Sequence, residues 1–460
     1  MDGAATILWF RRDLRTGDHP ALERAASGPV LGAFVGDPDL LAPAGPSRVA
    51  HVVSSLRALD ASLGGRLAVR TGAPEEVLAT LAGEVGARRV VATSDFAPAG
   101  RARDERVRRA LAARGIALEL LDSPYAVAPG TVRTRAGQPC RVFSAFLRGW
   151  APVDKGRARP APSVDWLVAP GEDPGGLLAL AGSRRPDYFA DLPDDPPSLP
   201  PAGEAAAHAA LEAFCERAER YGATRDLPAV EGTSRLSPHL KVGAIHPRTV
   251  LEVVGEGAGR FVAEVAWREF YADVLFHDPA SARAPWRGAL EGLRVDTDAR
   301  ARERFVAWAR GTTGYPLVDA GMRQLLVEGW MHNRVRMVCA SFLVKHLHLD
   351  WRWGARWFLW RLVDGDLASN QHGWQWVAGT GTDAAPFHRV FNPVRQDERF
   401  DPEGRYVRRY VPELAHLDAP DCLRPVGGGL LAPGYPAPIV DIDVERREAL
   451  ARLAEARGRT

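Results

Sequence analysis

Short apolar and β-branched runs alternate with longer amphipathic segments over the first part of the chain. The five runs with the length and residue types of a buried strand are Thr6–Phe10, Val30–Val35, Leu67–Arg70, Arg89–Thr93 and Ala117–Leu121. Between them, apolar positions recur every three or four residues over 48–63, 74–86 and 102–114, which predicts helices. Because strands that alternate with helices form parallel sheets, residues 1–125 are expected to form an α/β domain with a Rossmann-like parallel sheet.

Neither periodicity is sustained between residues 126 and 203. This stretch is rich in proline and glycine and ends in the run 191–201, DLPDDPPSLPP. Such a composition is typical of a segment that connects domains. We therefore predict a long interdomain linker over residues 126–203.

Helical periods dominate from residue 204 onward. They cover residues 204–221, 247–255, 261–276, 301–310, 317–328, 332–345 and 353–362, and a basic helix is predicted over 444–457. The strand pattern of the first part of the chain does not return. Residues 204–460 are therefore predicted to form an all-α domain.

Composition narrows the class of protein without indicating a function. A chain of 460 residues is too long for one hydrophobic core, and 46% hydrophobic with 25% charged residues is ordinary for a soluble globular protein. The net charge of +2 excludes no partner, because a basic groove can lie within a balanced total. No apolar run approaches the length of a membrane span, so no membrane partner is expected.

Cysteine usage and the N-terminal residues favour the cytoplasm. The four cysteines are scattered and form no CxxC pair, which fits a reducing compartment and argues against a structural zinc site. The start MDGAATILWF has neither the basic segment nor the cleavage site of a signal peptide. We expect a cytoplasmic protein without a metal site.

Residue types that often serve in functional sites are most concentrated in the stretch 364–376, DGDLASNQHGWQW. Two acids, an amide and two tryptophans fall within it, and ten of the 13 tryptophans lie between Trp267 and Trp376. On an extended or tightly turned backbone, Trp374 and Trp376 would point to opposite sides, so one indole could pack inward while the other faces a cavity. The alternative is two core tryptophans beside a polar loop.

Two predicted helices each place a tryptophan beside polar groups on one face. On the helix over 261–276 the residues of this face are Glu264, Trp267, Arg268 and Tyr271. Over the stretch 325–338 they are Trp330, Asn333, Arg334 and Met337. Two such faces could line a pocket for a flat aromatic ligand, whereas each face alone would also suit an ordinary helix with one buried and one solvated side.

Two further segments could bind anions. The turn 232–237, GTSRLS, precedes a helical segment, and its hydroxyl and backbone N–H groups would suit a phosphate or a simple helix cap. Arg11, Arg12 and Arg15 follow the first strand, where they could hold an anion or form a solvated face. No GxGxxG follows that strand, so the sequence lacks the dinucleotide-binding fingerprint.

Nine short motifs are spread over nearly the whole chain. In order they are LWFRRDLR, EGTSRLSPHLKVG, EVAWREFY, TGYPLVDAGMRQL, GWMHNRVRM, DGDLASN, GWQW, TGTDAAP and FNP. Each motif is weakly specific, but their joint order and spacing are highly specific. The set resembles the DNA photolyase/cryptochrome family and, within it, the class I cyclobutane pyrimidine dimer (CPD) photolyases. The resemblance implies an α/β antenna domain, a long linker and an all-α FAD-binding domain, in agreement with the division drawn from the hydrophobic pattern.

The resemblance also implies FAD as cofactor. The residues it assigns to FAD are Tyr221, Thr233, Ser234, Arg235, Leu236, Ser237, Arg336, Asp364, Asp366 and Asn370. Arg336 would pair with Asp364 near the flavin ring, and Asn370 would sit at flavin N5. The implied activity is DNA repair driven by blue light, in which reduced FAD passes an electron to the dimer, the cyclobutane ring opens and the electron returns.

Damaged DNA is the partner that the resemblance implies. The residues assigned to the lesion are Glu264, Trp267, Asn333, Met337 and Trp376, and those assigned to the DNA backbone are Arg225, Arg334 and Arg389. Trp267 and Trp376 would cradle a dimer that is flipped out of the helix, and Glu264 would hydrogen-bond its carbonyl oxygens. Glu264, Asn333 and Asn370 are the implied catalytic residues, and a monomer is expected.

The family reduces its flavin through three tryptophans, and this chain departs from that pattern. Trp374 and Trp351 match the proximal and middle positions. The third would fall within 293–297, LRVDT, which holds no tryptophan. Trp286 and Trp308 lie nearby in the sequence and could substitute for it. Slow photoreduction with normal dimer repair is therefore expected.

A second, light-harvesting chromophore is a further expectation. The loop 94–104, SDFAPAGRARD, resembles members that bind 8-hydroxy-deazaflavin (8-HDF) more than members that bind a folate. Arg11, Asp95 and Lys241 match the positions that such members use. We therefore favour 8-HDF, with an empty site or a flavin as the alternatives.

Three rival functions follow from the same residues. A (6-4) photolyase would need a catalytic histidine pair, and His332 alone does not supply one. A cryptochrome-type light receptor would not need Glu264, Trp267 and Trp376 together, and Asn370 also opposes it. A flavoprotein that transfers electrons in the dark would explain the FAD residues but not the arginines assigned to DNA.

Overall fold

The computed structural model describes residues 4–286, 292–383, 388–425 and 432–458. Contacts between residues divide the chain into two compact units. The first unit comprises residues 1–185, 200–219 and 234–279, and the second comprises residues 186–199, 220–233 and 280–460. These units do not follow the boundaries predicted after residues 125 and 203, and the division into antenna domain, linker and helical domain stays a prediction.

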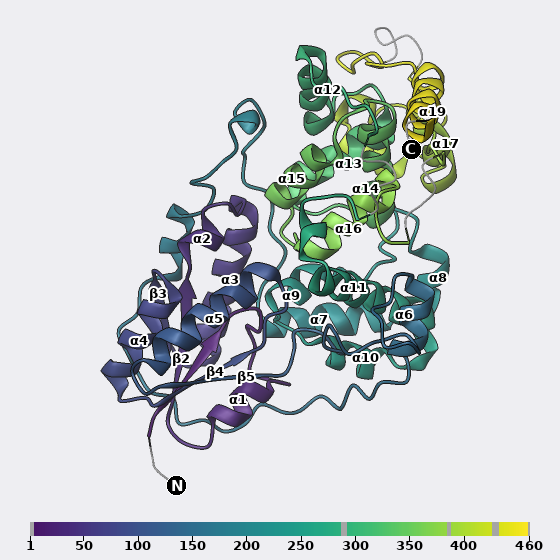
Figure 1. The fold of residues 1–460 in the computed structure, drawn as a ribbon. Coiled ribbons are helices and arrows are strands. Elements are labelled where there is room, and N and C mark those ends of the chain that lie inside the picture. The colour runs from purple at the N-terminus through teal and green to yellow at the C-terminus, as the bar shows by residue number, and fades with distance from the viewer. Residues whose placement is uncertain (1–3, 287–291, 384–387, 426–431, 459–460) are drawn as a thin grey trace. The chain divides into compact units, whose positions relative to one another are not determined.

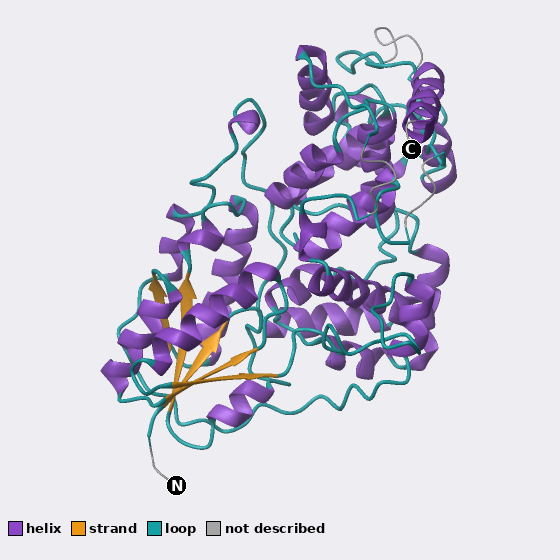
Figure 2. Cartoon of the chain, in the orientation of Figure 1, coloured by secondary structure: helices purple, strands orange, loops and turns teal. Residues whose placement is uncertain are grey.

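A five-stranded parallel sheet lies at the centre of the first unit (Figure 1; Figure 2). Its strands are β1 (Thr6–Phe10), β2 (Val30–Gly36), β3 (Leu67–Thr71), β4 (Arg89–Thr93) and β5 (Ala117–Leu121). The order is β3-β2-β1-β4-β5, and Thr6 of β1 pairs with Val30 on one side and with Arg89 on the other. Every residue of β1 and β2 is buried, because helices cover both faces of a parallel sheet. The predicted strands and the α/β fold are confirmed.

Helices connect the strands of this sheet. They are α1 (Pro20–Ala25), α2 (Pro38–Leu41), α3 (Pro46–Ser62), α4 (Pro74–Val85) and α5 (Pro98–Ala112). α4 and α5 pack on each other, and their apolar residues share one core with Ile7 and Trp9 of β1. The helices predicted over 48–63 and 102–114 begin earlier than expected, because Pro46 and Pro98 occupy their first turns.

Five more helices belong to the first unit. They are α6 (Phe143–Trp150), α7 (Glu204–Cys215), α9 (Ser237–Val242), α10 (Pro247–Val254) and α11 (Gly259–His277). α6 lies inside the stretch predicted as a linker, where eight residues among prolines and glycines are too few to show a helical period. The helix expected over 204–221 ends at Cys215 instead, and a short 3₁₀ turn follows it.

The regular secondary structure of the second unit consists of helices, without a strand, in the part of the chain that the structure describes. Its α-helices are α8 (Tyr221–Thr224), α12 (Ala299–Arg310), α13 (Pro316–Glu328), α14 (Asn333–Lys345), α15 (Trp351–Arg361), α16 (Leu367–Ala378), α17 (Pro393–Phe400), α18 (Arg405–Tyr410) and α19 (Ile442–Gly458). One hydrophobic core joins α12 to α19, and its largest fully buried side chains include Trp308, Trp357 and Phe342. The prediction of a helical C-terminal domain is confirmed.

The extended backbone expected at Trp374–Trp376 is wrong. Both residues lie in α16, which begins after Asp366, whose side chain accepts a hydrogen bond from Ser369 N at 3.1 Å. Successive helical residues are turned by about 100°, so the two indoles still point to different sides. Trp374 is 3% exposed, whereas Trp376 is partly exposed. The N-cap signal of Asp366 and the closing Gly379 could have revealed this helix from the sequence.

Candidate functional site

An ion pair lies beside the start of α16 in the second unit. Arg336 on α14 bonds Asp364 through Nη2 and Oδ2 at 2.8 Å, and its Nε donates to Met331 O at 2.8 Å. The Asp364 side chain is 3% exposed and that of Arg336 is 26% exposed. A buried carboxylate needs such a partner. The structure therefore brings together the two residues that the resemblance paired near a flavin.

Asn370 lies one turn into α16. Its side-chain nitrogen donates to Ala355 O at 3.0 Å and to Gln371 Oε1 at 2.9 Å. Both bonds use Nδ2, so the orientation of the amide is set by protein contacts and Oδ1 is directed away from them. An acceptor held in this way could receive a hydrogen bond from a ligand N–H group.

The turn predicted to bind phosphate has an unusual backbone conformation. Arg235 has φ +52°, the left-handed region that residues with a Cβ rarely adopt. Leu236 N donates to Ser234 Oγ at 3.4 Å, and α9 begins at the next residue, Ser237. A left-handed residue with a side chain costs about 1–2 kcal/mol, and such positions concentrate at functional sites. Residues 234–237 of this turn belong to the first unit, whereas Gly232 and Thr233 belong to the second together with the buried Tyr221.

α11 carries the first set of residues assigned to the lesion. Glu264 and Trp267 lie one turn apart and both are partly exposed. Arg268 was expected on the same face, but it donates to Pro124 O at 3.3 Å and to Leu240 O at 3.2 Å. Arg268 therefore holds neighbouring backbone, and the exposed pair consists of an acid and an indole.

α14 carries the second set, in the other unit. Asn333 is its first residue and is exposed, and Met337 lies one turn further along and is partly exposed. Trp376 on α16 is also partly exposed. Side chains that are not fully buried are available to a ligand, so all three are suited to contact one.

Two of the arginines assigned to DNA share one acid. Arg334 Nη2 lies 2.9 Å from Asp226 Oδ1, and Arg225 Nε lies 3.8 Å from the same oxygen. The Arg334 guanidinium also stacks over Phe400, with 4.5 Å between Cζ and the ring centroid. Asp226 was missed by the sequence analysis, although its place next to Arg225 was a signal. It holds two cations close together at the surface.

The third arginine, Arg389, is exposed, and its backbone carbonyl accepts a hydrogen bond from a buried side chain. The buried Lys345 donates from Nζ to Arg389 O at 2.9 Å. Residues 384–386 of the TGTDAAP motif lie outside the described residues. Lys345 was also missed, because nothing in the sequence pattern separates it from an ordinary residue at the end of a helix.

Trp374 lies within a cluster of aromatic rings. Its ring meets Phe358 edge-on at 5.0 Å and Trp308 edge-on at 6.1 Å, measured between centroids. Contacts continue from Trp308 to Phe305 at 5.9 Å and from Phe305 to Trp353 at 5.4 Å. Trp308 is fully buried, so it cannot itself be the solvent-facing end of an electron-transfer chain, whereas Trp353 is partly exposed. Trp351 is buried, and its role in such a chain stays a prediction.

The residues assigned to a second chromophore lie at the carboxyl ends of β1 and β4. Arg11 bonds Asp104 and Thr93 O, and Asp95 bonds Arg103 at 3.2 Å. Burial alone would raise the pKa of Asp95, but the arginines around it lower the pKa below its usual value. The order of the sheet reverses between β1 and β4, and ligands of such sheets bind at this point. Lys241 lies on α9 of the same unit.

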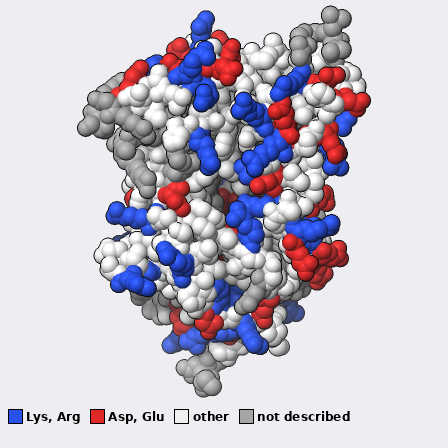
Figure 3. Space-filling view, turned by 90° about the vertical axis from the view of Figure 1, so that its right-hand side faces the viewer, with Lys and Arg blue, Asp and Glu red and all other residues white. Residues whose placement is uncertain are grey.

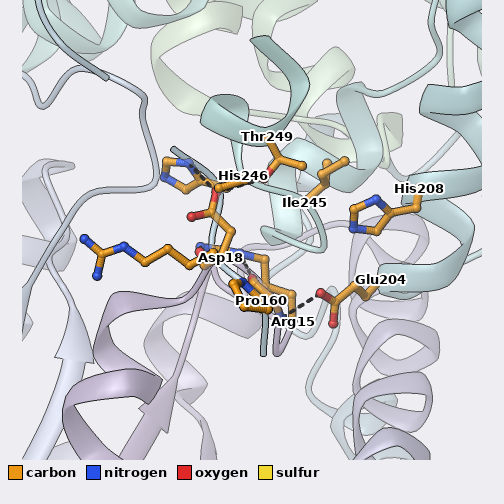
Figure 4. Close-up of a pocket in the computed structure, with 11 residues that line it drawn as sticks. Arg15, Asp18, Pro160, Glu204, His208, Ile245, His246 and Thr249 are labelled. Atoms are coloured by element: carbon orange, nitrogen blue, oxygen red, sulfur yellow. Dashed lines mark hydrogen bonds and ion pairs between the residues drawn. The ribbon is translucent and has the colours of Figure 1, made fainter. Parts of the chain in front are cut away.

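A pocket of about 340 Å³ lies elsewhere in the first unit (Figure 4). Its lining includes Arg15, Asp18, Glu204, His208, His246 and Thr249, and Arg15 is the one residue among the described lining that the sequence suggested for an anion. Glu204 accepts from Thr16 N at 2.7 Å and from Gly17 N at 2.8 Å. Burial holds the pKa of His246 well below its ordinary value, so this ring is neutral. The polar groups of the pocket join loops to helices and do not indicate a ligand.

Charge on the surface is mixed. Figure 3 shows Lys and Arg side chains interspersed with Asp and Glu over the face that it presents. Among the described residues, no group of three or more His, Cys, Asp or Glu is arranged to hold a metal ion. No helix within the described ranges is long and apolar enough to cross a membrane. The assignment of DNA contacts therefore depends on individual arginines.

Comparison with known proteins covers both ends of the chain. The protein-family model described as DNA photolyase matches residues 6–164. The family model described as FAD binding domain of DNA photolyase matches residues 261–455. The chain is 40% identical to a deoxyribodipyrimidine photo-lyase of Halobacterium salinarum, covering 98% of this chain and 99% of the relative. It is 39% identical to one of Agrobacterium fabrum, covering 99% of each.

Solved structures agree with these relatives. A class III photolyase from Agrobacterium tumefaciens has 38% sequence identity and a TM-score of 0.89, covering 100% of this chain and 98% of the other. An archaeal photolyase from Sulfolobus tokodaii with two FAD molecules has 30% identity and a TM-score of 0.84, covering 98% and 100%. The identities, the coverage and the shared fold lead to one conclusion: the chain belongs to the DNA photolyase/cryptochrome family.

Proposed function

We propose that this protein is a deoxyribodipyrimidine photo-lyase, an enzyme that uses light to split cyclobutane pyrimidine dimers in DNA. The observation that carries the proposal is the identity of 37–40% to several proteins of that name over nearly the full length of both chains. The partly exposed acid and indole of α11 support it, because a dimer needs both a polar and a stacking contact. The test is light-dependent loss of dimers from a defined oligonucleotide.

FAD is the cofactor, and the residues of the second unit fit it. The buried Arg336–Asp364 pair and the oriented amide of Asn370 offer a cation and a hydrogen-bond acceptor, which suit the polar edge of a flavin. When bound, reduced FAD supplies the absorption of light and the electron that opens the dimer. We assign Tyr221, Thr233 and Asp366 to further cofactor contacts.

The strained turn of the first unit contributes the remaining FAD residues. We assign Ser234, Arg235, Leu236 and Ser237 to the phosphates of the cofactor. The left-handed backbone at Arg235 supports this assignment, since a helix start behind such a turn directs N–H groups at an anion. Removal of FAD should therefore leave this turn less protected against hydrogen exchange.

The lesion is bound by stacking and by hydrogen bonds. We assign Trp267 and Trp376 to the two faces of the flipped dimer, and Met337 to an apolar contact with it. Glu264 and Asn333 hydrogen-bond the polar edge of the pyrimidines. An extruded dimer leaves its stack more readily than an intact base, because its pairing is already damaged. Arg225, Arg334 and Arg389 hold the flanking phosphates.

Glu264→Ala should leave FAD bound but lower repair per absorbed photon. Negative charge grows on a pyrimidine carbonyl as the electron arrives, and a hydrogen-bonding group at that oxygen stabilises the charge, so losing the group should lower the yield. The measurement is the quantum yield of repair by pre-reduced enzyme at saturating substrate. The control is Glu252→Ala on α10, an acid that bonds Ala158 N at 2.8 Å instead of lying on this face. An unchanged yield in the Glu264 variant would remove this residue from the mechanism.

The class of photolyase and the identity of the second chromophore are two more specific proposals. The motifs favour class I, whereas a solved structure that the chain resembles closely is a class III photolyase. For the antenna we propose 8-HDF at Arg11, Asp95 and Lys241, and the Sulfolobus tokodaii relative with two FAD molecules supports a second site in principle. The absorption spectrum of chromophores released from the native protein distinguishes 8-HDF, a folate and a flavin. We also propose that the enzyme acts as a monomer in the cytoplasm.

A further inference from the structure

α6 packs beside α11 (Figure 1), and the segment that leads into α6 is hydrogen-bonded to α11 at several points. Glu269 on α11 accepts hydrogen bonds from Ala126 N at 2.6 Å, Val127 N at 3.0 Å and Trp150 Nε1 at 2.6 Å. One turn later, Asp273 accepts from Gly130 N at 2.7 Å. The Trp150 bond holds the last residue of α6, so α6 is fixed along the helix that carries the lesion residues.

The first residue of α6 then meets Trp267. The rings of Phe143 and Trp267 stack with 3.8 Å between centroids and 11° between planes. Phe270 lies edge-on to both rings, at 5.9 Å from Phe143 and 5.7 Å from Trp267. Nearly parallel rings at this spacing are rarer than edge-on or offset pairs. Phe143 therefore covers one face of the indole, while Phe270 contacts it from the side.

We infer that Phe143 is a positioning residue for damage recognition: it backs the Trp267 indole and holds that ring ready to stack on the extruded dimer. The inference rests on the lesion role of Trp267 in the proposed function. An unsupported indole can rotate, and fixing a side chain on binding costs affinity. A ring that is already fixed by a parallel neighbour avoids that cost. The opposite role, in which Phe143 occupies the face that the base needs, would make its removal strengthen binding.

Three substitutions at Phe143 test the inference. F143A removes the ring, F143L keeps apolar volume without a flat face, and F143Y keeps the flat face. Dissociation constants are measured in the dark with the FAD-loaded full chain, for a CPD-containing duplex and for the same duplex undamaged. We expect F143A and F143L to weaken binding to damaged DNA by roughly 2- to 10-fold with little change for undamaged DNA, and F143Y to match the wild type.

A matched control lies on the same helix. Phe146 contacts Phe270 at 5.3 Å but its ring makes no contact with Trp267 among the described residues. F146L should therefore lower thermal stability like F143L and leave the ratio of damaged to undamaged affinity unchanged. A double-mutant cycle adds the decisive readout. In a W267A background, F143L should have no further effect on the ratio of damaged to undamaged affinity, because the inferred effect of Phe143 on that ratio passes through the indole.

The outcomes separate the inference from the function on which it rests. If F143L and F143Y give the same ratio, Phe143 only fills space and the inference is wrong. Tighter binding of damaged DNA by F143A or F143L would also overturn it. If W267A itself leaves the ratio of damaged to undamaged affinity unchanged, Trp267 does not bind the lesion, and the proposed function is wrong at this residue. If W267A lowers the ratio and F143L does not, the lesion role stands and only the inference fails.

Discussion

Trp267→Ala should weaken binding to a CPD-containing duplex by roughly 5- to 150-fold, with little change for undamaged DNA. Stacking of one base on an aromatic side chain is worth about 1–3 kcal/mol, and only an extruded base can reach a side chain in this way. Trp267 is partly exposed and its ring is held by Phe143, so the loss should come from the missing stack and not from disorder. The measurement is equilibrium binding in the dark at one fixed salt concentration.

Arg334→Ala is the matched comparison and should behave differently. Arg334 shares Asp226 with Arg225 at the surface, where a phosphate can compete for both cations. Loss of Arg334 should weaken binding to damaged and to undamaged DNA equally. It should also reduce the magnitude of the slope of log affinity against log salt concentration by about one. If the two variants gave the same ratio of damaged to undamaged affinity, the separation of lesion and backbone roles would be wrong.

Trp374→Phe should abolish photoreduction of oxidised FAD and leave repair by pre-reduced enzyme unchanged. Repair returns its electron to the flavin, so it does not use a chain of oxidisable side chains. Photoreduction does, and the resemblance to the family assigns Trp374 to the first position of that chain. The measurement pairs the rate of photoreduction with an external reductant against the quantum yield of repair. Normal photoreduction in Trp374→Phe would show that electrons enter elsewhere.

The next step after Trp374 can be resolved with four further variants. Trp351→Phe removes the middle residue of the family pattern, and Trp308→Phe removes the indole that meets Trp374 at 6.1 Å. We expect wild-type photoreduction to be slow, because residues 293–297 hold no tryptophan and Trp308 is fully buried. Trp357→Phe is the control, since this indole is also fully buried but makes no ring contact with Trp374 within the described residues. A long-lived tryptophan radical in high yield that survives Trp308→Phe and Trp286→Phe would contradict this account.

The sheet and most helices could be predicted because their signals are local. Runs such as Thr6–Phe10 are apolar or β-branched at every position, as expected of a strand that is buried on both faces. The resemblance to the family predicted that Arg336 pairs with Asp364, and in the structure Arg336 Nη2 lies 2.8 Å from Asp364 Oδ2. α16 was missed because its tryptophans and glycine were interpreted as a turn, although Asp366 and Gly379 mark the ends of a helix.

Contacts between distant segments could not be predicted in the same way. Phe143 and Trp267 are separated by a long stretch of sequence, and their stacking depends on Glu269, a buried acid that a helical pattern does not distinguish from a surface one. The role of Asp226 between two arginines likewise depends on how the residues that follow α8 meet Arg334 of α14. Such positions are set by tertiary packing, so a single sequence carries little signal for them.

The most direct test of the central claim is repair of defined substrates by pre-reduced, FAD-loaded protein. Three oligonucleotides of one sequence, carrying a CPD, a (6-4) photoproduct or no damage, are each incubated in blue light and in the dark. The account predicts that the CPD strand returns to intact thymines in the light alone, and that the (6-4) strand is unchanged. Repair in the dark, repair of the (6-4) strand or an unchanged CPD strand in the light would contradict it.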